Sequence, residues 1–279
     1  MVTAGFIGLG SQGGGMAARI IEQGVPTTLW ARRGEVLEPY AGRAAFAVDA
    51  YEVGERSDVV GICVTDGAAV REVVLGARGV LAGMRAGGVL AIHSTIGPEE
   101  CVALGSAAAA AGVRCIDAPV SGGGAVAAAG ALTVYVGGDA AAVDFARPVL
   151  ETYGNPVFHM GALGSGMRTK LLNNALVAAH FALAHDSFRL GTEEGLDPAT
   201  LADALRSGSG RSFSMEVFLG LGSFEPIADH VGPIMAKDVG LFARETAGAG
   251  DRARATVLDA ADRFLHLIGH PREESEGAR

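Results

Sequence analysis

Short runs of β-branched and apolar residues alternate with alanine-rich segments through about residue 160 of the chain. The runs with the composition of strands are 5–7, 27–30, 59–64, 89–92 and 113–116. Strands that alternate with helical segments form a parallel sheet with helices packed on its faces. Two further runs, 132–136 and 157–159, are expected to extend the sheet at one edge. The alternation predicts an α/β, doubly wound Rossmann domain over residues 1–162.

The second part of the chain has a different pattern. Strand signals stop at Gly164-Ser165-Gly166, and no proline or glycine interrupts the residues from Met167 to about Leu190. This stretch predicts one long interdomain helix, which is apolar nearly all round and should therefore be buried, in part by a second subunit. Helical spacing broken by glycine and serine continues to about His266. We expect a smaller all-α domain over residues 163–279 and a homodimer or homotetramer.

Composition and charge exclude several classes of protein. With 279 residues, 49% of them hydrophobic, the chain can bury a substantial core. A formal net charge of −9, with no basic block longer than Arg32-Arg33, argues against a nucleic-acid surface. Three cysteines without ligand spacing suggest neither disulfides nor a metal site, and they fit a reducing cytoplasm. The acidic balance favours small-molecule partners, and no apolar run is long enough to predict a membrane span.

The segment Gly8-Leu9-Gly10-Ser11-Gln12-Gly13 directly follows the first expected strand and opens a segment without helix breakers. In this context Gly8 permits a tight turn, Gly10 lets the backbone approach a pyrophosphate, and Gly13 lets the helix pack on the strand. The positive end of the helix would face the anion. The segment predicts a dinucleotide-binding loop formed by residues 8–13.

The residues at the end of the second expected strand indicate whether the cofactor is NAD or NADP. An acidic residue there would bind the ribose hydroxyls of NAD, but the sequence has Arg32 and Arg33. A positive pair suits the 2′-phosphate of NADP, so NADPH is the expected cofactor and NAD is less favoured. The competing interpretation is two solvated arginines in a loop.

Three further segments, taken with the glycine-rich opening, resemble one family. They are Asp117-Ala118-Pro119-Val120-Ser121-Gly122-Gly123, then Gly164-Ser165-Gly166 with Lys170-Leu171-Leu172-Asn173-Asn174, and finally Lys237-Asp238. Their order and spacing resemble the β-hydroxyacid dehydrogenases, the group that contains 3-hydroxyisobutyrate dehydrogenase and, more remotely, 6-phosphogluconate dehydrogenase. The resemblance spans nearly the whole chain.

The residue chemistry of these segments agrees with the resemblance. The Ser121 hydroxyl and the backbone amides of Gly122 and Gly123 can form an anion nest for a substrate carboxylate, although an ordinary glycine-rich loop would look alike. Lys170 and Asn174 are four residues apart and share one helix face. Burial at the head of an apolar helix should lower the pKa of Lys170 toward a value useful for proton transfer.

The resemblance further implies roles for individual positions. Lys170 would be the catalytic acid/base, and Asn174 would be a second catalytic residue beside it. Val64, Thr65 and Thr95 would line the cofactor at strand ends, and Lys237 would reach the cofactor or substrate. Asp238 would position a helix, and Arg211 could contact the far end of the substrate. Gln12 and His93 depart from the family's usual methionine and acidic residue, which affects the expected shape of the nicotinamide pocket.

The sequence thus predicts an NADP-dependent 3-hydroxyacid dehydrogenase or semialdehyde reductase. One alternative is an imine reductase of the same architecture, although a lysine at position 170 would oppose the charge of an iminium substrate. An alternative of another class is a non-catalytic NADP-binding sensor. Retention of Lys170, Asn174 and Ser121 together argues against the sensor.

Overall fold

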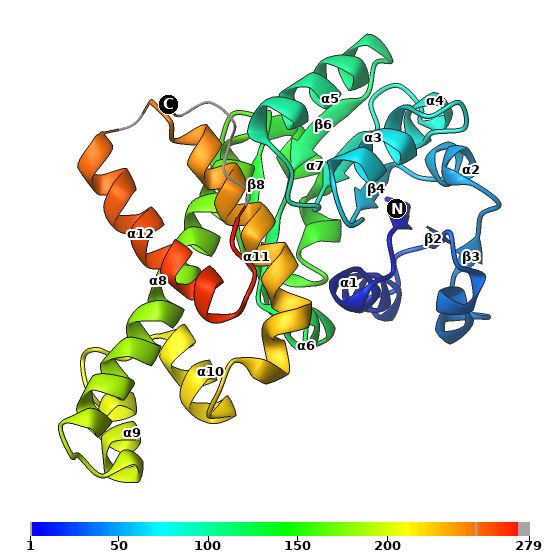
Figure 1. Ribbon diagram of the computed structural model, residues 1–279. Helices are drawn as coiled ribbons and strands as arrows, with labels where there is room; N and C mark the ends of the chain where they lie inside the picture. Colours follow the sequence, from blue (N-terminus) through cyan, green and yellow to red (C-terminus); the bar gives the residue numbers. More distant parts are fainter. Residues whose placement is uncertain (1, 249, 273–279) are drawn as a thin grey trace. The chain divides into compact units, whose positions relative to one another are not determined.

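The computed structural model describes residues 2–248 and 250–272, and the chain divides into two compact units, Met1–Lys170 and Leu171–Arg279 (Figure 1). The strands are β1 (Ala4–Ile7), β2 (Thr27–Trp30), β3 (Ala45–Phe46), β4 (Val59–Ile62), β5 (Val89–Ile92), β6 (Arg114–Asp117), β7 (Val120–Ser121), β8 (Leu132–Gly137) and β9 (Gly154–Gly161). The α-helices of the first unit are α1 (Ser11–Glu22), α2 (Ala50–Glu55), α3 (Gly67–Leu75), α4 (Val80–Gly83), α5 (Pro98–Ala110), α6 (Gly123–Ala128) and α7 (Ala140–Leu150), with a 3-10 helix η1 (Gly34–Tyr40).

All strands of the first unit join one sheet. Its order is β3-β2-β1-β4-β5-β6-β8-β7, and β9 pairs with β8. The pairs from β3 to β6 are parallel, whereas β8 runs antiparallel to β6 and β7. The order 3-2-1-4-5-6 is that of the dinucleotide-binding α/β fold, in which ligands bind beyond the carboxyl ends of the strands. The expected Rossmann fold class and the extension of the sheet at one edge are confirmed.

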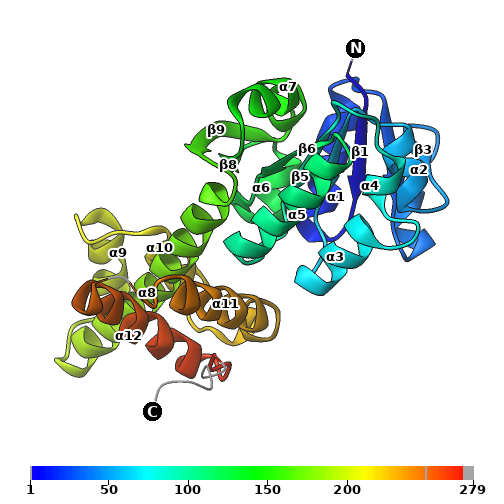
Figure 2. The ribbon, with the colours of Figure 1, turned by 90° about the horizontal axis from the view of Figure 1, so that it is seen from above.

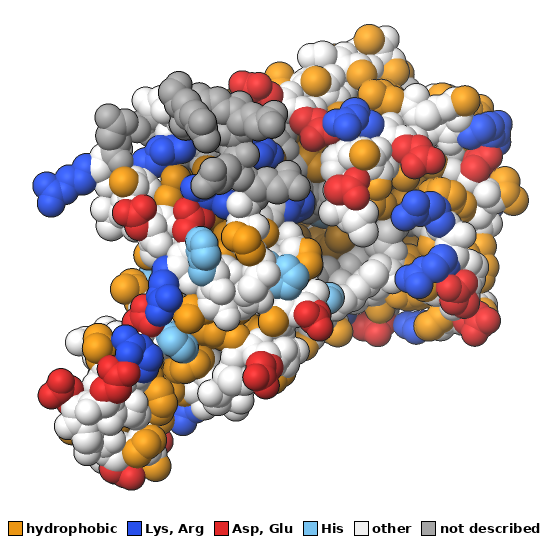
Figure 3. All heavy atoms as spheres, viewed as in Figure 1, with side chains coloured by type: hydrophobic (Ala, Val, Ile, Leu, Met, Phe, Trp, Pro, Cys, Tyr) orange, Lys and Arg blue, Asp and Glu red, His pale blue; other side chains and the backbone are white. Residues whose placement is uncertain are grey.

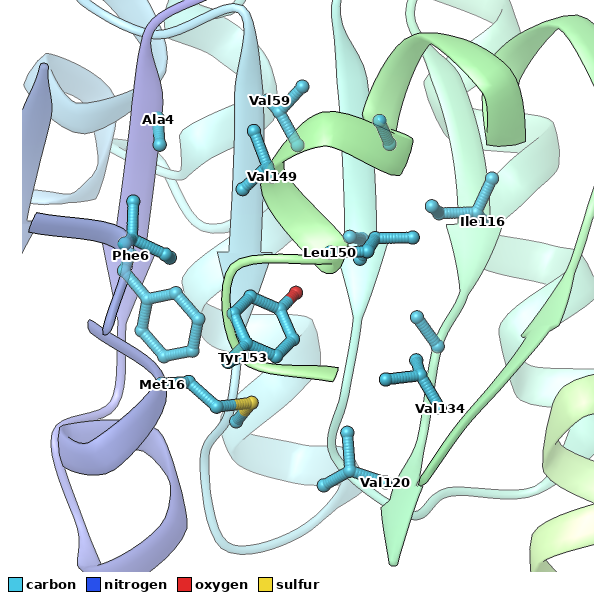
Figure 4. Close-up of a cluster of buried hydrophobic side chains, with 14 of the residues drawn as sticks. Ala4, Phe6, Met16, Val59, Ile116, Val120, Val134, Val149, Leu150 and Tyr153 are labelled. Atoms are coloured by element: carbon cyan, nitrogen blue, oxygen red, sulfur yellow. The ribbon is translucent and has the colours of Figure 1, made fainter. Parts of the chain in front are cut away.

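Helices flank the sheet on both sides, as Figure 2 shows, and an apolar cluster lies on each of its two faces. One contains residues of α1, α6 and α7, with Phe6, Met16 and Tyr153 packed together as shown in Figure 4. The other contains residues of α2 to α5. Strands buried on both faces explain why the sequence shows continuous apolar runs rather than strict alternation.

The second unit is helical in its described residues. Its helices are α9 (Pro198–Ser207), α10 (Phe213–Leu221), α11 (Glu225–Glu245) and α12 (Asp251–Leu267), and it contains most of α8 (Ser165–Glu193). Its core is rich in aromatic rings, with Phe181 stacked on Phe264 at 4.9 Å and perpendicular to Phe224 at 5.6 Å. The expected all-α region is confirmed.

Helix α8 is longer than the sequence pattern indicates and is not buried all round. It begins at Ser165 and includes Gly166 and Gly191, because a glycine weakens a helix without ending it. One face leaves four leucines about half exposed within the chain: Leu172, Leu176, Leu183 and Leu190. Hydrophobic side chains (orange) are visible on the surface of this unit in Figure 3. Within the described residues, no helix combines the length and apolarity that crossing a bilayer demands.

Candidate active site

The glycine-rich segment joins β1 to the first turn of α1, and two of its glycines, Gly8 and Gly13, are required by close backbone contacts. Gly8 has φ +97°, and a Cβ there would lie 2.1 Å from the Cys63 carbonyl oxygen. A Cβ on Gly13 would lie 1.9 Å from the Gly8 carbonyl oxygen, so only glycine permits this approach of helix to strand. A Cβ on Gly10 would meet nothing within 4 Å and would instead occupy open space in front of the helix.

The first turn of α1 is suited to an anion. Gly10 is the N-cap residue and supplies no side-chain hydrogen bond, and the first turn contains no acidic residue. The amides of this turn and the helix dipole therefore favour a phosphate in front of the helix. The cradle left by Gly10 fits the pyrophosphate of a dinucleotide, with Leu9, Ser11 and Gln12 completing the segment.

Arg32 and Arg33 follow β2 after one intervening residue, Ala31, and both are exposed. Arg33 is the N-cap residue of η1, and its Nε lies 3.8 Å from Glu35 Oε1. Strand β2 is the neighbour of β1, so the arginines lie beyond the carboxyl end of the strand next to the glycine-rich loop.

The carboxyl ends of β4 and β5 are joined by a serine that the sequence analysis did not single out. The Val64 amide donates to Ser94 Oγ at 2.8 Å, which links the segment carrying Thr65 to the segment carrying Thr95. Thr65 Oγ1 in turn donates to Asp66 Oδ2 at 3.0 Å. In the sequence, the only indication of the Val64–Ser94 hydrogen bond is that Ser94 stands beside Thr95 just after an expected strand.

Ser121 ends β7, where it pairs with Thr133 of β8. The following glycines both have positive φ, +137° at Gly122 and +81° at Gly123, the latter being the first residue of α6. Tyr135 lies two residues beyond Thr133 on the same sheet face, and its hydroxyl hydrogen-bonds Ser121; burial raises the pKa of Tyr135. The Ser121 side chain is thus held by a neighbouring strand.

Asp117, at the end of β6, is fully buried. Its Oδ1 accepts the Gly164 amide at 2.7 Å and its Oδ2 accepts the Met167 amide at 2.6 Å, both at the start of α8. Burial raises the pKa of Asp117, and these two amides oppose that shift. The only indication of this contact in the sequence is a carboxylate directly after a run with the composition of a strand.

His93, the other departure from the family pattern, is buried at the end of β5. Its Nδ1 lies 2.6 Å from the Ala118 carbonyl oxygen and its Nε2 lies 3.2 Å from the Tyr153 hydroxyl. Burial lowers the pKa of His93 to about 4, against the effect of the Ala118 hydrogen bond. A neutral ring that donates from Nδ1 to Ala118 and accepts at Nε2 from Tyr153 satisfies all three groups.

The remaining predicted residues lie on the helices. Lys170 and Asn174, one turn apart on α8, are 9% and 7% exposed. Asn174 Nδ2 donates to Asp238 Oδ2 at 2.6 Å, and Lys237 Nζ lies 3.2 Å from Asp238 Oδ1. The structure thus brings Asn174 and Lys237 together on Asp238. Arg211 lies in the exposed turn between α9 and α10.

Comparison with known families covers nearly the whole chain. Residues 3–161 match the family described as the NAD binding domain of 6-phosphogluconate dehydrogenase. Residues 164–266 match the family described as the NAD-binding of NADP-dependent 3-hydroxyisobutyrate dehydrogenase.

Individual proteins show the same relationship. The chain is 35% identical to the 3-hydroxyisobutyrate dehydrogenase of Pseudomonas aeruginosa over 219 residues, which cover 78% of this chain and 74% of the relative. The solved structure of Mycobacterium tuberculosis 3-hydroxyisobutyrate dehydrogenase with L-serine superposes with a TM-score of 0.84 at 28% identity, covering 98% of this chain and 96% of that one. The structure of Psf3 in complex with NADP+ and 2-OPP gives a TM-score of 0.83 at 30% identity, with the same coverage. The chain therefore belongs to the β-hydroxyacid dehydrogenase family and is a nicotinamide-dependent oxidoreductase of the 3-hydroxyisobutyrate dehydrogenase type.

Proposed function

We propose that this protein transfers hydride between NADPH or NADP+ and a short 3-hydroxy acid or the corresponding aldehyde acid, with Lys170 as the general acid/base. The observation that carries the proposal is a buried lysine one helical turn from Asn174, whose amide is fixed on a buried carboxylate. An exposed lysine on a helix surface would carry no such implication. Family membership supplies the class of reaction.

The preference for NADP rests on the residues after β2. Arg32 and Arg33 stand where a ribose-binding carboxylate would favour NAD, and both side chains are exposed to a ligand. Glu35 is too far from Arg33, at 3.8 Å, to neutralise it through a strong hydrogen bond. The bound NADP+ of Psf3, a structural relative, is consistent with this choice.

Lys170 handles the proton that accompanies hydride transfer. When bound, the nicotinamide supplies or accepts the hydride. In the reductive direction the Lys170 ammonium gives a proton to the carbonyl oxygen, which becomes the hydroxyl; in oxidation the neutral amine takes that proton back. Burial keeps bulk water from competing as the proton donor, and a positioned acid of this kind contributes about 10²- to 10⁴-fold in rate.

The substrate class follows from the anion nest after β7. The Ser121 hydroxyl and the backbone amides of Gly122 and Gly123 would bind the carboxylate, because successive positive-φ glycines let neighbouring amides point toward one anion. Lys237, held by Asp238, would add a positive charge, and Arg211 would contact the far end of a longer substrate. Thr65, Thr95 and Val64 would line the cofactor.

The assembly that best suits the chain is a dimer of two copies packed through the α8 face formed by Leu172, Leu176, Leu183 and Leu190, or a tetramer built from such dimers. These leucines follow helical spacing, so they form one continuous stripe. We also propose the cytoplasm as its location, since NADPH is a reductant of that compartment and the three cysteines are free thiols.

The experiment is NADPH consumption, with NADH as the control cofactor, against a panel of short aldehyde acids and a few cyclic imines. Wild type is compared with Lys170→Ala and with Arg189→Ala, a matched variant of an exposed cation on the same helix. Turnover of an aldehyde acid that falls at least about 100-fold in Lys170→Ala alone supports the proposal. Turnover of imines only, or full activity in Lys170→Ala, would refute it, and NADPH binding without any turnover would favour a sensor.

A further inference from the structure

The first turn of α8 takes its capping group from a distant strand. The residue before the helix is Gly164, which has no side chain to accept a hydrogen bond. The Asp117 carboxylate, 47 and 50 residues earlier in the chain, accepts the amides of Gly164 and Met167 instead. A full negative charge at this point also faces the positive end of a 29-residue helix.

The backbone closes tightly around this carboxylate. A Cβ on Gly137 would lie 2.2 Å from Asp117 Oδ1, and a Cβ on Gly166 would lie 2.8 Å from Asp117 Oδ2. Both positions therefore need glycine if β8 and α8 are to approach Asp117 this closely. With contacts from both oxygens and from two flanking glycines, the Asp117 carboxylate has little freedom to move.

Asp117 lies between two segments of the proposed active site. Lys170 follows Met167 by three residues, so the contact is within one helical turn of the proposed acid/base. On the other side, Asp117 begins the segment that leads to Ser121, and the next residue, Ala118, is held by the His93 ring at 2.6 Å. The start of α8 is thus fixed to the strand that leads into the proposed carboxylate-binding loop.

We propose that Asp117 is a positioning residue for Lys170, which sets where the amine lies relative to the Ser121 segment. The proposal rests on the proposed function of Lys170. Asp117 touches neither substrate nor cofactor in this role; it acts by fixing the helix turn that carries the amine. Because misplacement of a catalytic group by about 1 Å can lower the rate about 10²-fold, loosening this turn should be visible in kcat.

The test is a double-mutant cycle between Asp117→Asn and Lys170→Ala. The asparagine oxygen can accept only one of the two amides, and its NH2 group would face the other. In the wild-type background we expect kcat to fall about 10- to 100-fold, with the Kd for NADPH changed by less than about twofold. In the Lys170→Ala background the same substitution should cause no further loss, because there is no amine left to misplace.

Controls separate positioning from general destabilisation. Asp139→Asn is the matched variant, since Asp139 caps α7 by accepting the amides of Ala141 and Ala142, and it should lower the Tm without lowering kcat. Amide hydrogen exchange at Met167, measured without substrate, should accelerate in Asp117→Asn and not in Asp139→Asn. Asp117→Ser, which leaves room for water to replace the lost oxygen, is measured in parallel so that the result does not depend on one variant folding.

The outcomes are distinct. Equal loss of kcat from Asp117→Asn in both backgrounds, or no loss in the wild-type background, would overturn the positioning role while leaving the function of Lys170 intact. Full activity in Lys170→Ala alone would instead refute the proposed function, and that result needs no Asp117 variant. Loss confined to the background that contains Lys170 would establish the coupling.

Discussion

The side-chain amide of Asn174 on α8 donates to the carboxylate of Asp238 on α11 at 2.6 Å, across 64 residues of sequence. Asp238 is 1% exposed, and its second oxygen lies 3.2 Å from the Lys237 ammonium group. A buried carboxylate is costly unless hydrogen-bonded or paired, so both partners contribute to holding the charge inside the helical unit. The residue that the sequence suggested as a helix-positioning partner thus holds two of the proposed site residues at once.

Asn174→Ala is expected to destabilise the protein by about 2 kcal/mol, because it removes a hydrogen bond from a charged group that stays buried. Asn174→Asp should destabilise it more, since two carboxylates would then face each other. Urea unfolding measures both effects, with Ser187→Ala on an exposed position of the same helix as the control. An Asn174→Ala protein as stable as the control would show that the Asp238 carboxylate is held by other groups.

The parts of the site that the sequence predicts well are those in which the motif itself fixes the geometry. Gly8, Gly10 and Gly13 act through their own backbone and the strand that precedes them, so their spacing suffices. The Asn174–Asp238 pair depends on the packing of α8 against α11 within the helical unit, and no local pattern encodes that register. For the same reason, the motif that contains Asp117 does not predict that its carboxylate accepts the amides at the start of α8.

Arg32→Ala is predicted to weaken NADPH binding by about tenfold or more and to leave NADH binding nearly unchanged. A hydrogen bond between Arg32 and the 2′-phosphate of NADPH would contribute about 1.5–3 kcal/mol to binding. NADH has no 2′-phosphate, so its binding does not depend on this hydrogen bond. Fluorescence titration of both nucleotides measures the effect. Arg189→Ala, an exposed arginine of the helical unit, is the control for change of net charge.

Arg33→Ala should behave in the same way, and the double variant should bring the affinities for NADPH and NADH close together. Equal losses for both nucleotides would instead indicate a general effect on the loop after β2, and the assignment of NADP would then be wrong. Glu35, whose carboxylate lies 3.8 Å from Arg33, supplies a second comparison. If Arg33 binds the 2′-phosphate, Glu35→Gln should strengthen NADPH binding slightly.

His93 predicts a pH dependence of stability. Burial holds its pKa at about 4 in the folded chain, whereas an unfolded histidine titrates near about 6.5. Between these values the unfolded state binds a proton that the native state does not, so the free energy of unfolding falls as the pH falls. The contribution of His93 is complete above about pH 6.5 and is lost progressively toward pH 4, at up to about 1.4 kcal/mol per pH unit.

His93→Gln should remove this dependence, because a glutamine amide can still donate to the Ala118 carbonyl but does not titrate. Urea unfolding of both proteins at about pH 7 and about pH 5 gives the comparison, and the wild type should lose about 2 kcal/mol more than the variant over that interval. The subtraction cancels the other histidines. Identical slopes would mean that the folded protein protonates His93 as readily as the unfolded chain does.

On the α8 face, the apolar composition of the sequence does not predict which residues the same chain buries. The sequence indicates a helix that is apolar nearly all round, and the fold of one chain covers only part of it, leaving the four leucines about half exposed. Periodicity cannot show whether a face is covered by the same chain or by another copy, because both remove it from water equally.

The leucine stripe on α8 predicts a concentration-dependent dimer that Leu176→Glu should disrupt. Each half-exposed leucine buried on association contributes about 1 kcal/mol, and a symmetric contact would use all four leucines from both copies. In a symmetric dimer, a glutamate at position 176 would face the leucines of the second copy. Its carboxylate would lose water without gaining a hydrogen-bond partner. Light scattering should therefore give a dimer or tetramer mass for the wild type and a smaller one for Leu176→Glu. Leu75→Glu, an equally exposed leucine at the end of α3, should leave the mass unchanged, and a monodisperse wild-type monomer at micromolar concentration would contradict the proposed interface.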